Sequence, residues 1–468
     1  QAVGIDATAC ADARLCALPG FDGLDLTPLD AEEQAELDDP YIFHFPDGNA
    51  GLTRLMVRKL IPQVAPGHTM QDVVLAKFDY SKLDLPEHKV QLRLGSTALQ
   101  AKNVRLADGK LYPDIQVNTF RNIDRLFPTR TVARGSVVSE LPLSKQPLKD
   151  FAYNVDGQRY DLYDVLSMNR VSGLLIIKNG EIVFEKYLLG NTPDTRWMSM
   201  SVVKSITATL IGAAIQDGFI RSIDDPIVNY LPRFNGTVYD GVTVKHLLQM
   251  SSGVAWNETY TDPASDRRRM LEAQLSQQPD AVLNLMASLP RAAAPGTVWN
   301  YSTGETQLAG ALVQAATGKP VAQYLSDKIW SKLGMQADAN WWLQSPDGLE
   351  IGGSGLSATL RDYARLGLFW LNDGVISVNG KVQRVLPEGW MQAASSRQHI
   401  GGKTVDYGYM LWPLHGNSYA AEGIFGQYLF VDPDTKLVVA MWSAQSKPLY
   451  RAGLNEYRFL QALSEHFQ

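Results

Sequence analysis

The feature that most constrains the fold is a pair of hairpin signals, one in mid-chain and one near the C-terminal end. Apolar runs flank an Asn-Gly turn within 173–185, and Asn-Gly between such runs is the strongest short hairpin signal. A second hairpin is predicted over 427–442, around a turn at Asp432-Pro433-Asp434. The sequence between the two hairpins is mostly compatible with helices. Strands at both ends with helices between them predict an α+β fold whose terminal strands share one sheet.

The N-terminal third has a different pattern. Short alternating runs such as 90–94 and 114–117, separated by turn residues, indicate strands. A segment around Pro147 looks like a connector. We therefore expect a β-rich extension over residues 1–150 and a separate domain over 151–468.

Composition excludes several classes of protein. The net charge is −6 and no long run of Lys or Arg occurs, which argues against a nucleic-acid binder that neutralises phosphates. No apolar stretch approaches the roughly 20 residues of a membrane helix, so no membrane span is expected. The seven His include no HxH or HxxxH pair, so no metal site is expected.

The two cysteines, Cys10 and Cys16, lie in one short segment. A local disulfide there would imply an oxidising compartment, and a pair of free thiols is the alternative. The chain begins at Gln1 without an initiator Met, which fits either a shortened fragment or a mature form whose leader has been removed. We therefore expect a secreted or periplasmic protein.

The first chemical signal is Ser201 followed by Lys204, at the start of a helix-compatible stretch over 201–216. Residues three apart share a helix face, so the amine can reach the hydroxyl. A serine becomes a good nucleophile when a base takes its proton, and a lysine can be that base only if its pKa is lowered. Alone, the spacing of Ser201 and Lys204 is weak evidence for a catalytic pair, because a helix-capping Ser followed by a solvated Lys gives the same pattern.

Two later segments contain groups that could donate a proton to the leaving group and bind the oxyanion. Tyr301 lies on a loop before a helix, where it could pass a proton to the leaving group, although a Tyr there is also a common core residue. In Ala421-Glu422-Gly423-Ile424, a glycine lets the backbone approach a substrate. A backbone N–H there could form an oxyanion hole with that of Ser201, and an ordinary β-turn is the alternative.

Together these residues resemble the motifs of the penicillin-recognising serine hydrolases, in the family's order. The resemblance is greatest to class C β-lactamase-like esterases and 6-aminohexanoate-dimer (nylon oligomer) hydrolases. It implies an antiparallel sheet flanked by helices, with an all-helical subdomain. Further segments that look like those of the family are 245–254, 352–365 and 407–412.

The same resemblance assigns roles to individual residues. Ser201 would be the acylated nucleophile, Lys204 its base and Tyr301 the proton relay. The N–H of Ile424 would be the second oxyanion donor. Tyr260 would be a substrate-facing tyrosine on a mobile loop, and no metal or cofactor is implied.

Departures from the family pattern bear on the substrate. Thr303 stands where β-lactamases have Asn, and Ala421-Glu422-Gly423 stands where they have Lys-Thr-Gly. A Glu at that place would repel the carboxylate of a β-lactam. We therefore assign Thr303, Glu422 and Gly423 to substrate binding, and expect a neutral ester or amide, or one with a cationic group near Glu422.

The sequence thus predicts a serine hydrolase that cleaves an amide or ester bond of a small or oligomeric substrate through an acyl-enzyme on Ser201. The alternatives are a penicillin-recognising sensor that is acylated without efficient turnover, and a true β-lactamase. In a further alternative, the N-terminal region is a partner- or wall-binding module. A homodimer and a monomer both remain open.

Overall fold

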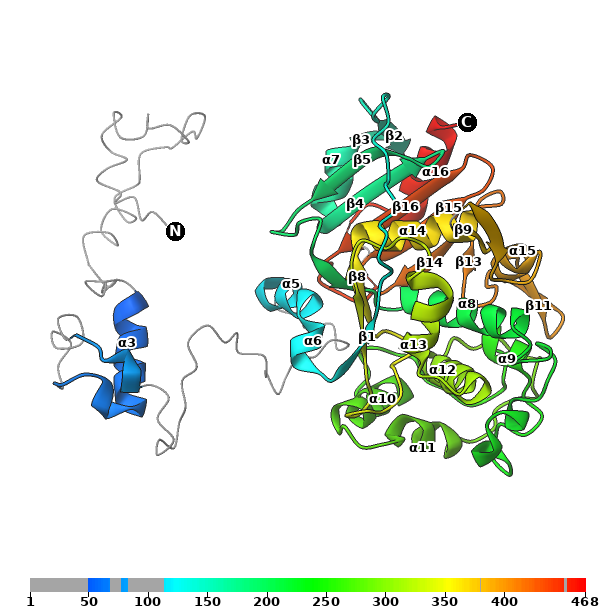
Figure 1. Cartoon of the computed structure of the whole chain (residues 1–468), viewed down its shortest axis with the longest axis horizontal. Coiled ribbons are helices and arrows are strands. Elements are labelled where there is room, and N and C mark those ends of the chain that lie inside the picture. The colour runs from blue at the N-terminus through cyan, green and yellow to red at the C-terminus, as the bar shows by residue number, and fades with distance from the viewer. Residues whose placement is uncertain (1–48, 68–76, 83–112, 379, 450–452) are drawn as a thin grey trace. The chain divides into compact units, whose positions relative to one another are not determined.

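The computed structural model describes residues 49–67, 77–82, 113–378, 380–449 and 453–468. Contacts divide the chain into two compact units, Gln1–Ala98 and Leu99–Gln468 (Figure 1). Cys10, Cys16 and the strand expected at 90–94 lie outside the described residues, so the disulfide remains a prediction.

The described part of the first unit is small. It contains helix α3 (Asn49–Leu60) and two single 3₁₀ turns, η1 (Pro62–Val64) and η2 (Tyr80–Lys82). An apolar cluster joins these elements and consists of Ile61, Val64, Ala65 and Phe78.

A six-stranded antiparallel sheet organises the second unit (Figure 1). Strand β16 pairs with β4, so that Val439 lies opposite Ile176 and segments far apart in the sequence become neighbours. Both expected hairpins and their shared sheet are therefore confirmed. In spatial order the strands are β13 (Trp412–Pro413), β14 (Tyr419–Gly423), β15 (Gln427–Asp432), β16 (Leu437–Ser443), β4 (Val171–Lys178) and β5 (Glu181–Tyr187).

Smaller sheets and helices surround this sheet. A four-stranded sheet has the order β1 (Thr129–Val132), β7 (Ala339–Trp342), β8 (Leu356–Thr359) and β6 (Arg196–Met198). Three two-stranded sheets pair β2 (Ala152–Val155) with β3 (Gln158–Asp161), β9 (Val375–Val378) with β10 (Lys381–Arg384), and β11 (Gln398–Ile400) with β12 (Lys403–Val405). The α-helices are α5 (Pro113–Arg121), α6 (Ile123–Leu126), α7 (Leu162–Met168), α8 (Val202–Gln216), α9 (Val244–Leu248), α10 (Asp266–Leu275), α11 (Ala281–Ala287), α12 (Thr303–Thr317), α13 (Val321–Leu325), α14 (Leu360–Leu371), α15 (Trp390–Ser395) and α16 (Glu456–His466). Short helical turns are η3 (Ile227–Asn229), η4 (Pro232–Phe234) and η5 (Ser326–Trp330).

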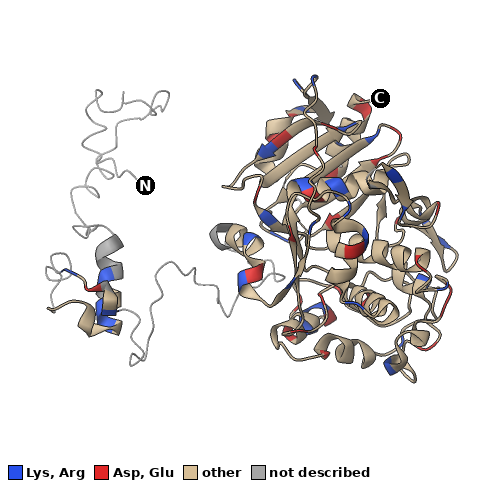
Figure 2. Cartoon of the chain, viewed as in Figure 1, with Lys and Arg blue, Asp and Glu red and all other residues tan. Residues whose placement is uncertain are grey.

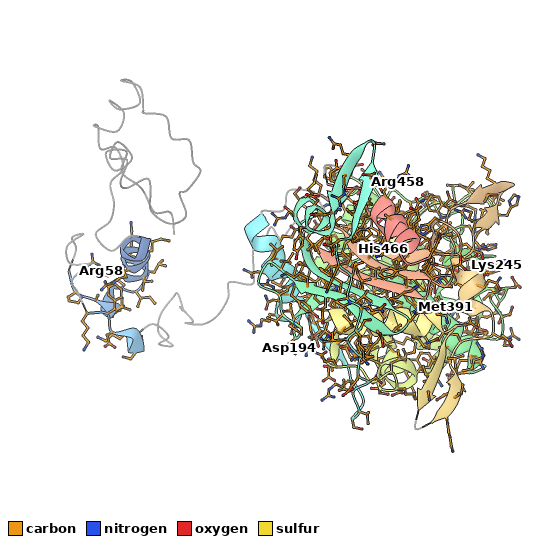
Figure 3. All side chains as sticks on the ribbon, turned by 90° about the horizontal axis from the view of Figure 1, so that it is seen from above. Arg58, Asp194, Lys245, Met391, Arg458 and His466 are labelled. Atoms are coloured by element: carbon orange, nitrogen blue, oxygen red, sulfur yellow. The ribbon has the colours of Figure 1, made fainter. Side chains whose placement is uncertain are left out.

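The pleat of strand β4 sorts its side chains between two apolar cores. Leu174 and Ile176 belong to the core that includes residues of α7 and α16, whereas Leu175 and Ile177 belong to the larger core. Successive side chains of a strand point to opposite faces, so a strand covered on both faces is apolar throughout. Helix α14 packs on the face of the larger core, and α16, marked by Arg458 and His466 in Figure 3, contributes to the other core.

Helix α8 links the sheet to a group of helices. It contacts β14 and β15 of the sheet and also α12, which in turn contacts α9, α10, α11 and α13. Every residue of α8 from Val202 to Ala214 is buried, including Lys204 and three hydroxyl side chains, so this helix is covered on all sides. The expected fold, an antiparallel sheet flanked by helices with a helical subdomain, is confirmed.

Charged residues are interspersed along the elements of the second unit (Figure 2). The whole chain carries 43 basic and 49 acidic residues, and Figure 2 shows both signs on helices and strands alike. Among the helices that the structure describes, none is long and apolar enough to cross a bilayer.

The prediction of a strand at 114–117 is wrong, because these residues lie in helix α5. Alternation over four residues fits both structures, whereas burial at Gln116, Thr119, Phe120 and Ile123 follows the helical spacing. Pro113 occupies the first helical position, where its missing N–H costs no hydrogen bond. Across its described residues, the extension is therefore more helical than β-rich.

The segment around α5 packs against the rest of the second unit. Phe120 is fully buried, with its ring centroid 5.3 Å from that of Trp197 and 5.7 Å from that of Phe425. Gln116 Nε2 donates to the backbone oxygen of Gln445 at 2.7 Å. The unit defined by contacts thus begins before residue 151, and the domain boundary at 150/151 remains a prediction.

We expect Phe120→Ala to lower the free energy of unfolding of the second unit by about 3–5 kcal/mol, because a buried aromatic ring is replaced by a cavity. The control is Phe219→Ala, at a ring that is 43% exposed, with an expected loss below about 1 kcal/mol. Urea unfolding followed by tryptophan fluorescence measures both values. Equal small losses would contradict the packing of α5.

Candidate active site

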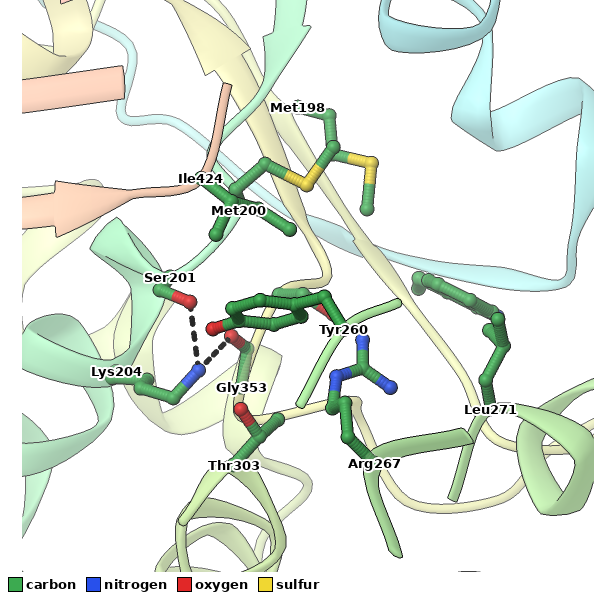
Figure 4. Close-up of a pocket in the computed structure, with 12 residues that line it drawn as sticks. Met198, Met200, Ser201, Lys204, Tyr260, Arg267, Leu271, Thr303, Gly353 and Ile424 are labelled. Atoms are coloured by element: carbon green, nitrogen blue, oxygen red, sulfur yellow. Dashed lines mark hydrogen bonds between the residues drawn. The ribbon is translucent and has the colours of Figure 1, made fainter. Parts of the chain in front are cut away.

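Ser201 and Lys204 are brought together at the start of helix α8. Ser201 Oγ makes no capping hydrogen bond with the helix and lies 2.8 Å from Lys204 Nζ (Figure 4). Lys204 Nζ also donates to the backbone oxygen of Gly353 at 2.8 Å. The exposed fraction is 9% for Ser201 and 2% for Lys204. The arrangement is the buried hydroxyl–amine pair that the spacing predicted.

Burial controls the protonation of this lysine. Loss of solvation lowers the pKa of Lys204 from 10.5 to about 7, the negative charge of Glu258 opposes the shift, and the positive charge of Arg267 adds to it. An amine with a pKa near 7 is substantially neutral at physiological pH and can accept a proton. The pair therefore has the electrostatics that a serine nucleophile requires.

Tyr301 lies next to the same pair. Its ring centroid is 5.4 Å from Lys204 Nζ, and its ring stacks on Trp412 at 5.9 Å. Burial raises the pKa of Tyr301, as does the negative charge of Glu258, while a hydrogen bond with Ser201 acts in the opposite direction. The phenol keeps its proton at neutral pH, so Lys204 is the better base and Tyr301 a proton donor.

Two backbone segments in left-handed conformations meet beside Ser201. Met200 has φ 47° and Phe425 has φ 66°, and non-glycine residues adopt this region rarely, often at functional sites. A Cβ atom on Gly423 would lie 2.8 Å from the backbone oxygen of Ser199. The turn between β14 and β15, which carries Ile424, therefore approaches the nucleophile closely.

A small cavity is lined by Ser201, Lys204 and Ile424, though not by Tyr301 (Figure 4). Its volume is about 20 Å³, roughly the space of one water molecule. In Figure 4 the hydroxyl of Tyr260 points toward Ser201 and Lys204, so a substrate requires Tyr260 to move. The cavity is lined by Met198, Met200, Ser201, Lys204, Tyr260, Arg267, Leu271, Thr303, Trp342, Gly353, Ser354 and Ile424.

Thr303 is held by a carboxylate that the sequence did not single out. Its backbone N–H donates to Glu258 Oε2 at 2.9 Å and its hydroxyl to Glu258 Oε1 at 2.5 Å. Trp256 Nε1 also donates to Glu258 Oε2, at 2.5 Å. These bonds tie the loop that carries Tyr260 to the start of α12.

Glu422 and Gly423 do not line the cavity. The Glu422 carboxyl accepts a hydrogen bond from Tyr457 Oη of α16 at 2.8 Å. Burial raises the pKa of Glu422 to about 8, so this carboxyl is mostly protonated at neutral pH. The cavity therefore gives no support to a substrate cation beside Glu422.

Sequence reasoning missed several residues that line or support the site. Gly353 had a signal, since it lies in the glycine-rich segment 352–355, but not the contact of its oxygen with Lys204. Arg267 stands in a run of three arginines, a pattern typical of an exposed helix face. Among the described residues, no group of three or more His, Cys, Asp or Glu side chains is placed to hold a metal ion.

The sequence profile of the family described as Beta-lactamase matches residues 168–463, and the chain belongs to this family. A 6-aminohexanoate-dimer hydrolase from Paenarthrobacter ureafaciens is 30% identical over 305 residues, which are 62% of this chain and 76% of the relative. Esterase EstB from Burkholderia gladioli is 33% identical over 150 residues, which are 31% of this chain and 38% of that esterase. The protein is thus a hydrolase of the serine β-lactamase family.

Solved structures agree on the fold. The structure named "Putative 6-aminohexanoate-dimer hydrolase from Bacillus anthracis" aligns with a TM-score of 0.66 and 22% identity, over 79% of this chain and 96% of that one. A penicillin binding protein from Bacillus halodurans aligns with a TM-score of 0.52 and 20% identity, over 66% of this chain and all of the other.

A second buried carboxyl near the site, that of Glu305, is coupled to protein stability. It lies in the first turn of α12 and accepts a hydrogen bond from Ser252 Oγ. Burial raises the pKa of Glu305 from 4.5 to about 8. Between about pH 4.5 and pH 8 the folded protein therefore keeps a proton that the unfolded chain has already released. Stability falls as the pH rises through this window.

We expect Glu305→Gln to remove this pH dependence, because an amide resembles the protonated carboxyl but does not ionise. The variant should match the wild type near pH 4.5 and be more stable by roughly 4 kcal/mol at pH 8. Chemical denaturation at both pH values measures the difference. The exposed Glu181→Gln serves as the control, and an equal change in both variants would contradict the assignment to Glu305.

Proposed function

We propose that this hydrolase cleaves an amide or ester bond of a small or oligomeric substrate through an acyl-enzyme on Ser201. The observation that carries the proposal is the buried contact of 2.8 Å between Ser201 Oγ and Lys204 Nζ. Its support is the pKa of Lys204, about 7, which leaves a base beside the hydroxyl at neutral pH.

In the first half of the reaction, neutral Lys204 takes the proton of Ser201 while Oγ attacks the substrate carbonyl. The backbone N–H groups of Ser201 and Ile424 bind the oxyanion that develops on the carbonyl oxygen. Tyr301 gives a proton to the departing alcohol or amine and is reprotonated from Lys204. The bond to the leaving group breaks and the acyl group stays on Ser201.

In the second half, water attacks the acyl-enzyme. The regenerated neutral Lys204, with Tyr301, takes a proton from the water molecule, and the Ser201 oxygen leaves with a proton as the acid product forms. The same oxyanion donors serve both halves, because each passes through a tetrahedral intermediate.

The named activities of the relatives bear on the substrate. One relative is named a 6-aminohexanoate-dimer hydrolase and another an esterase, so both bond types are candidates here. Ala421 and Glu422 stand where β-lactamases have the Lys and Thr of Lys-Thr-Gly; the two side chains of that motif that help bind a β-lactam are therefore absent here, which disfavours a β-lactam as the main substrate. A sensor that is acylated without turnover is an outcome of the kinetic test below.

We expect Ser201→Ala to lower the turnover of a p-nitrophenyl ester by at least about a thousandfold without a change in melting temperature. The control is Ser205→Ala on the same helix, since the Ser205 hydroxyl donates to the backbone oxygen of Met410 instead of facing the cavity. Retained turnover in Ser201→Ala would overturn the assignment. A single equivalent of p-nitrophenol from wild type, followed by a stall, would favour the sensor.

The rate should also depend on pH through Lys204. Because the base acts in its neutral form, kcat/KM should fall about tenfold per pH unit below about pH 7 and level off above it. Glu422→Gln removes the nearby carboxyl with a pKa of about 8 and should retain this limb. A limb that disappears in Glu422→Gln, or a rate that stays flat down to pH 5, would contradict the role of Lys204.

A further inference from the structure

Arg267 is a buried cation in the wall of the cavity that contains Ser201 and Lys204 (Figure 4). Its side chain is 7% exposed. Two of its three guanidinium nitrogens, Nε and Nη1, have no hydrogen-bond partner among the described residues. Buried polar groups almost always have partners, so these unused donors need an explanation.

The position of Arg267 on its helix makes it more unusual. It is the second residue of α10, after the cap at Ser265, where the positive end of the helix dipole disfavours a cation. Its two neighbours differ from it: Arg268 pairs with Glu272 and Arg269 with Asp266, both on the same helix. Of the three consecutive arginines, Arg267 is the one that lines the cavity.

Glu258 does not satisfy the donors of Arg267. The separation between Arg267 Nε and Glu258 Oε1 is 3.8 Å, beyond hydrogen-bond distance. The carboxylate instead accepts the hydrogen bonds from Thr303 and Trp256. Glu258 thus offsets part of the charge of Arg267 but leaves its Nε and Nη1 without a hydrogen bond.

From these observations we propose that Arg267 binds a carboxylate of the substrate, so that the enzyme prefers esters or amides that carry an anionic group near the scissile bond. This inference rests on the proposed function, because it places the scissile carbonyl at Ser201 in the same cavity. A guanidinium offers a fork of N–H donors that matches a carboxylate, and desolvation strengthens such a pair. The neutral or cationic substrate expected from Glu422 is replaced by an anionic one.

The test compares two matched pairs of ester probes. In the first pair, mono-p-nitrophenyl adipate carries a carboxylate on the acyl side and its methyl ester does not. In the second pair, p-carboxyphenyl butyrate carries a carboxylate on the leaving group and its methyl ester does not. The measured quantity is the ratio of kcat/KM within each pair, on the high-pH plateau, where Lys204 is neutral in every variant.

The variants isolate the guanidinium. Arg267→Gln should lower the ratio for at least one pair by about ten- to a hundredfold, the value of a hydrogen-bonded charge pair, and change the neutral probes by less than about threefold. Arg267→Lys keeps the charge without the fork and should give an intermediate ratio. Arg269→Gln removes the same charge from the 51% exposed arginine of the helix and should leave both ratios unchanged.

Equal ratios in wild type, Arg267→Gln and Arg269→Gln would overturn the proposal, as would an equal loss on charged and neutral probes. If Arg267→Gln fails to fold, the proposal is tested by two other measurements: the ratio of Arg267→Lys and the ratio of wild type within each pair of probes. A wild-type ratio that favours neither probe, or an unchanged ratio in Arg267→Lys, would then overturn the proposal. If wild type hydrolyses none of the probes, the proposed function fails. Calorimetric binding of adipate to Ser201→Ala, with and without Arg267→Gln, then decides the carboxylate site independently: adipate binding weakened at least about tenfold by Arg267→Gln supports it, and no binding or unchanged binding overturns it.

Discussion

The removal of Lys204 from water is the constraint on which the rest of the site depends. An ammonium group costs free energy to bury, and this lysine has only a hydroxyl and a backbone carbonyl as hydrogen-bond partners. Its pKa therefore falls until the neutral form is well populated near pH 7. Helix α8 makes this burial possible, because it is covered on all sides by the sheet and by α12.

The backbone next to the Ser201–Lys204 pair depends on packing from other segments. The left-handed conformations at Met200 and Phe425 persist only where neighbouring structure holds them. Phe425 packs against Phe120 of α5, which also contacts Trp197 of β6, three residues before Met200. A segment outside the matched family region thus supports both backbone turns that meet at Ser201.

Which side chains of the site carry a charge depends on their burial as well as on residue type. Glu422 is acidic in sequence but mostly protonated at neutral pH, because desolvation raises its pKa to about 8 even though the hydrogen bond from Tyr457 acts in the opposite direction. Glu258 accepts hydrogen bonds from Thr303 and Trp256. Arg267 lines the cavity, and its Nε and Nη1 have no hydrogen-bond partner among the described residues. The position of Glu422 in the sequence favoured a neutral or cationic substrate, whereas the environment of Arg267 is the basis of the anionic substrate proposed above.

The two hairpins, the shared sheet and the proximity of Ser201 to Lys204 were predictable from the sequence, because they depend on local turn chemistry and on helical spacing. The strand predicted at 114–117 was wrong, because an alternation over four residues fits both a strand and a helix. Only the packing of Phe120 distinguishes the two structures. Only the tertiary structure revealed Glu258, Gly353 and Arg267 around the nucleophile, since their roles arise from contacts between distant segments. The fold also sets which groups are charged, because the depth at which Lys204 and Glu422 are buried in the folded chain determines their protonation.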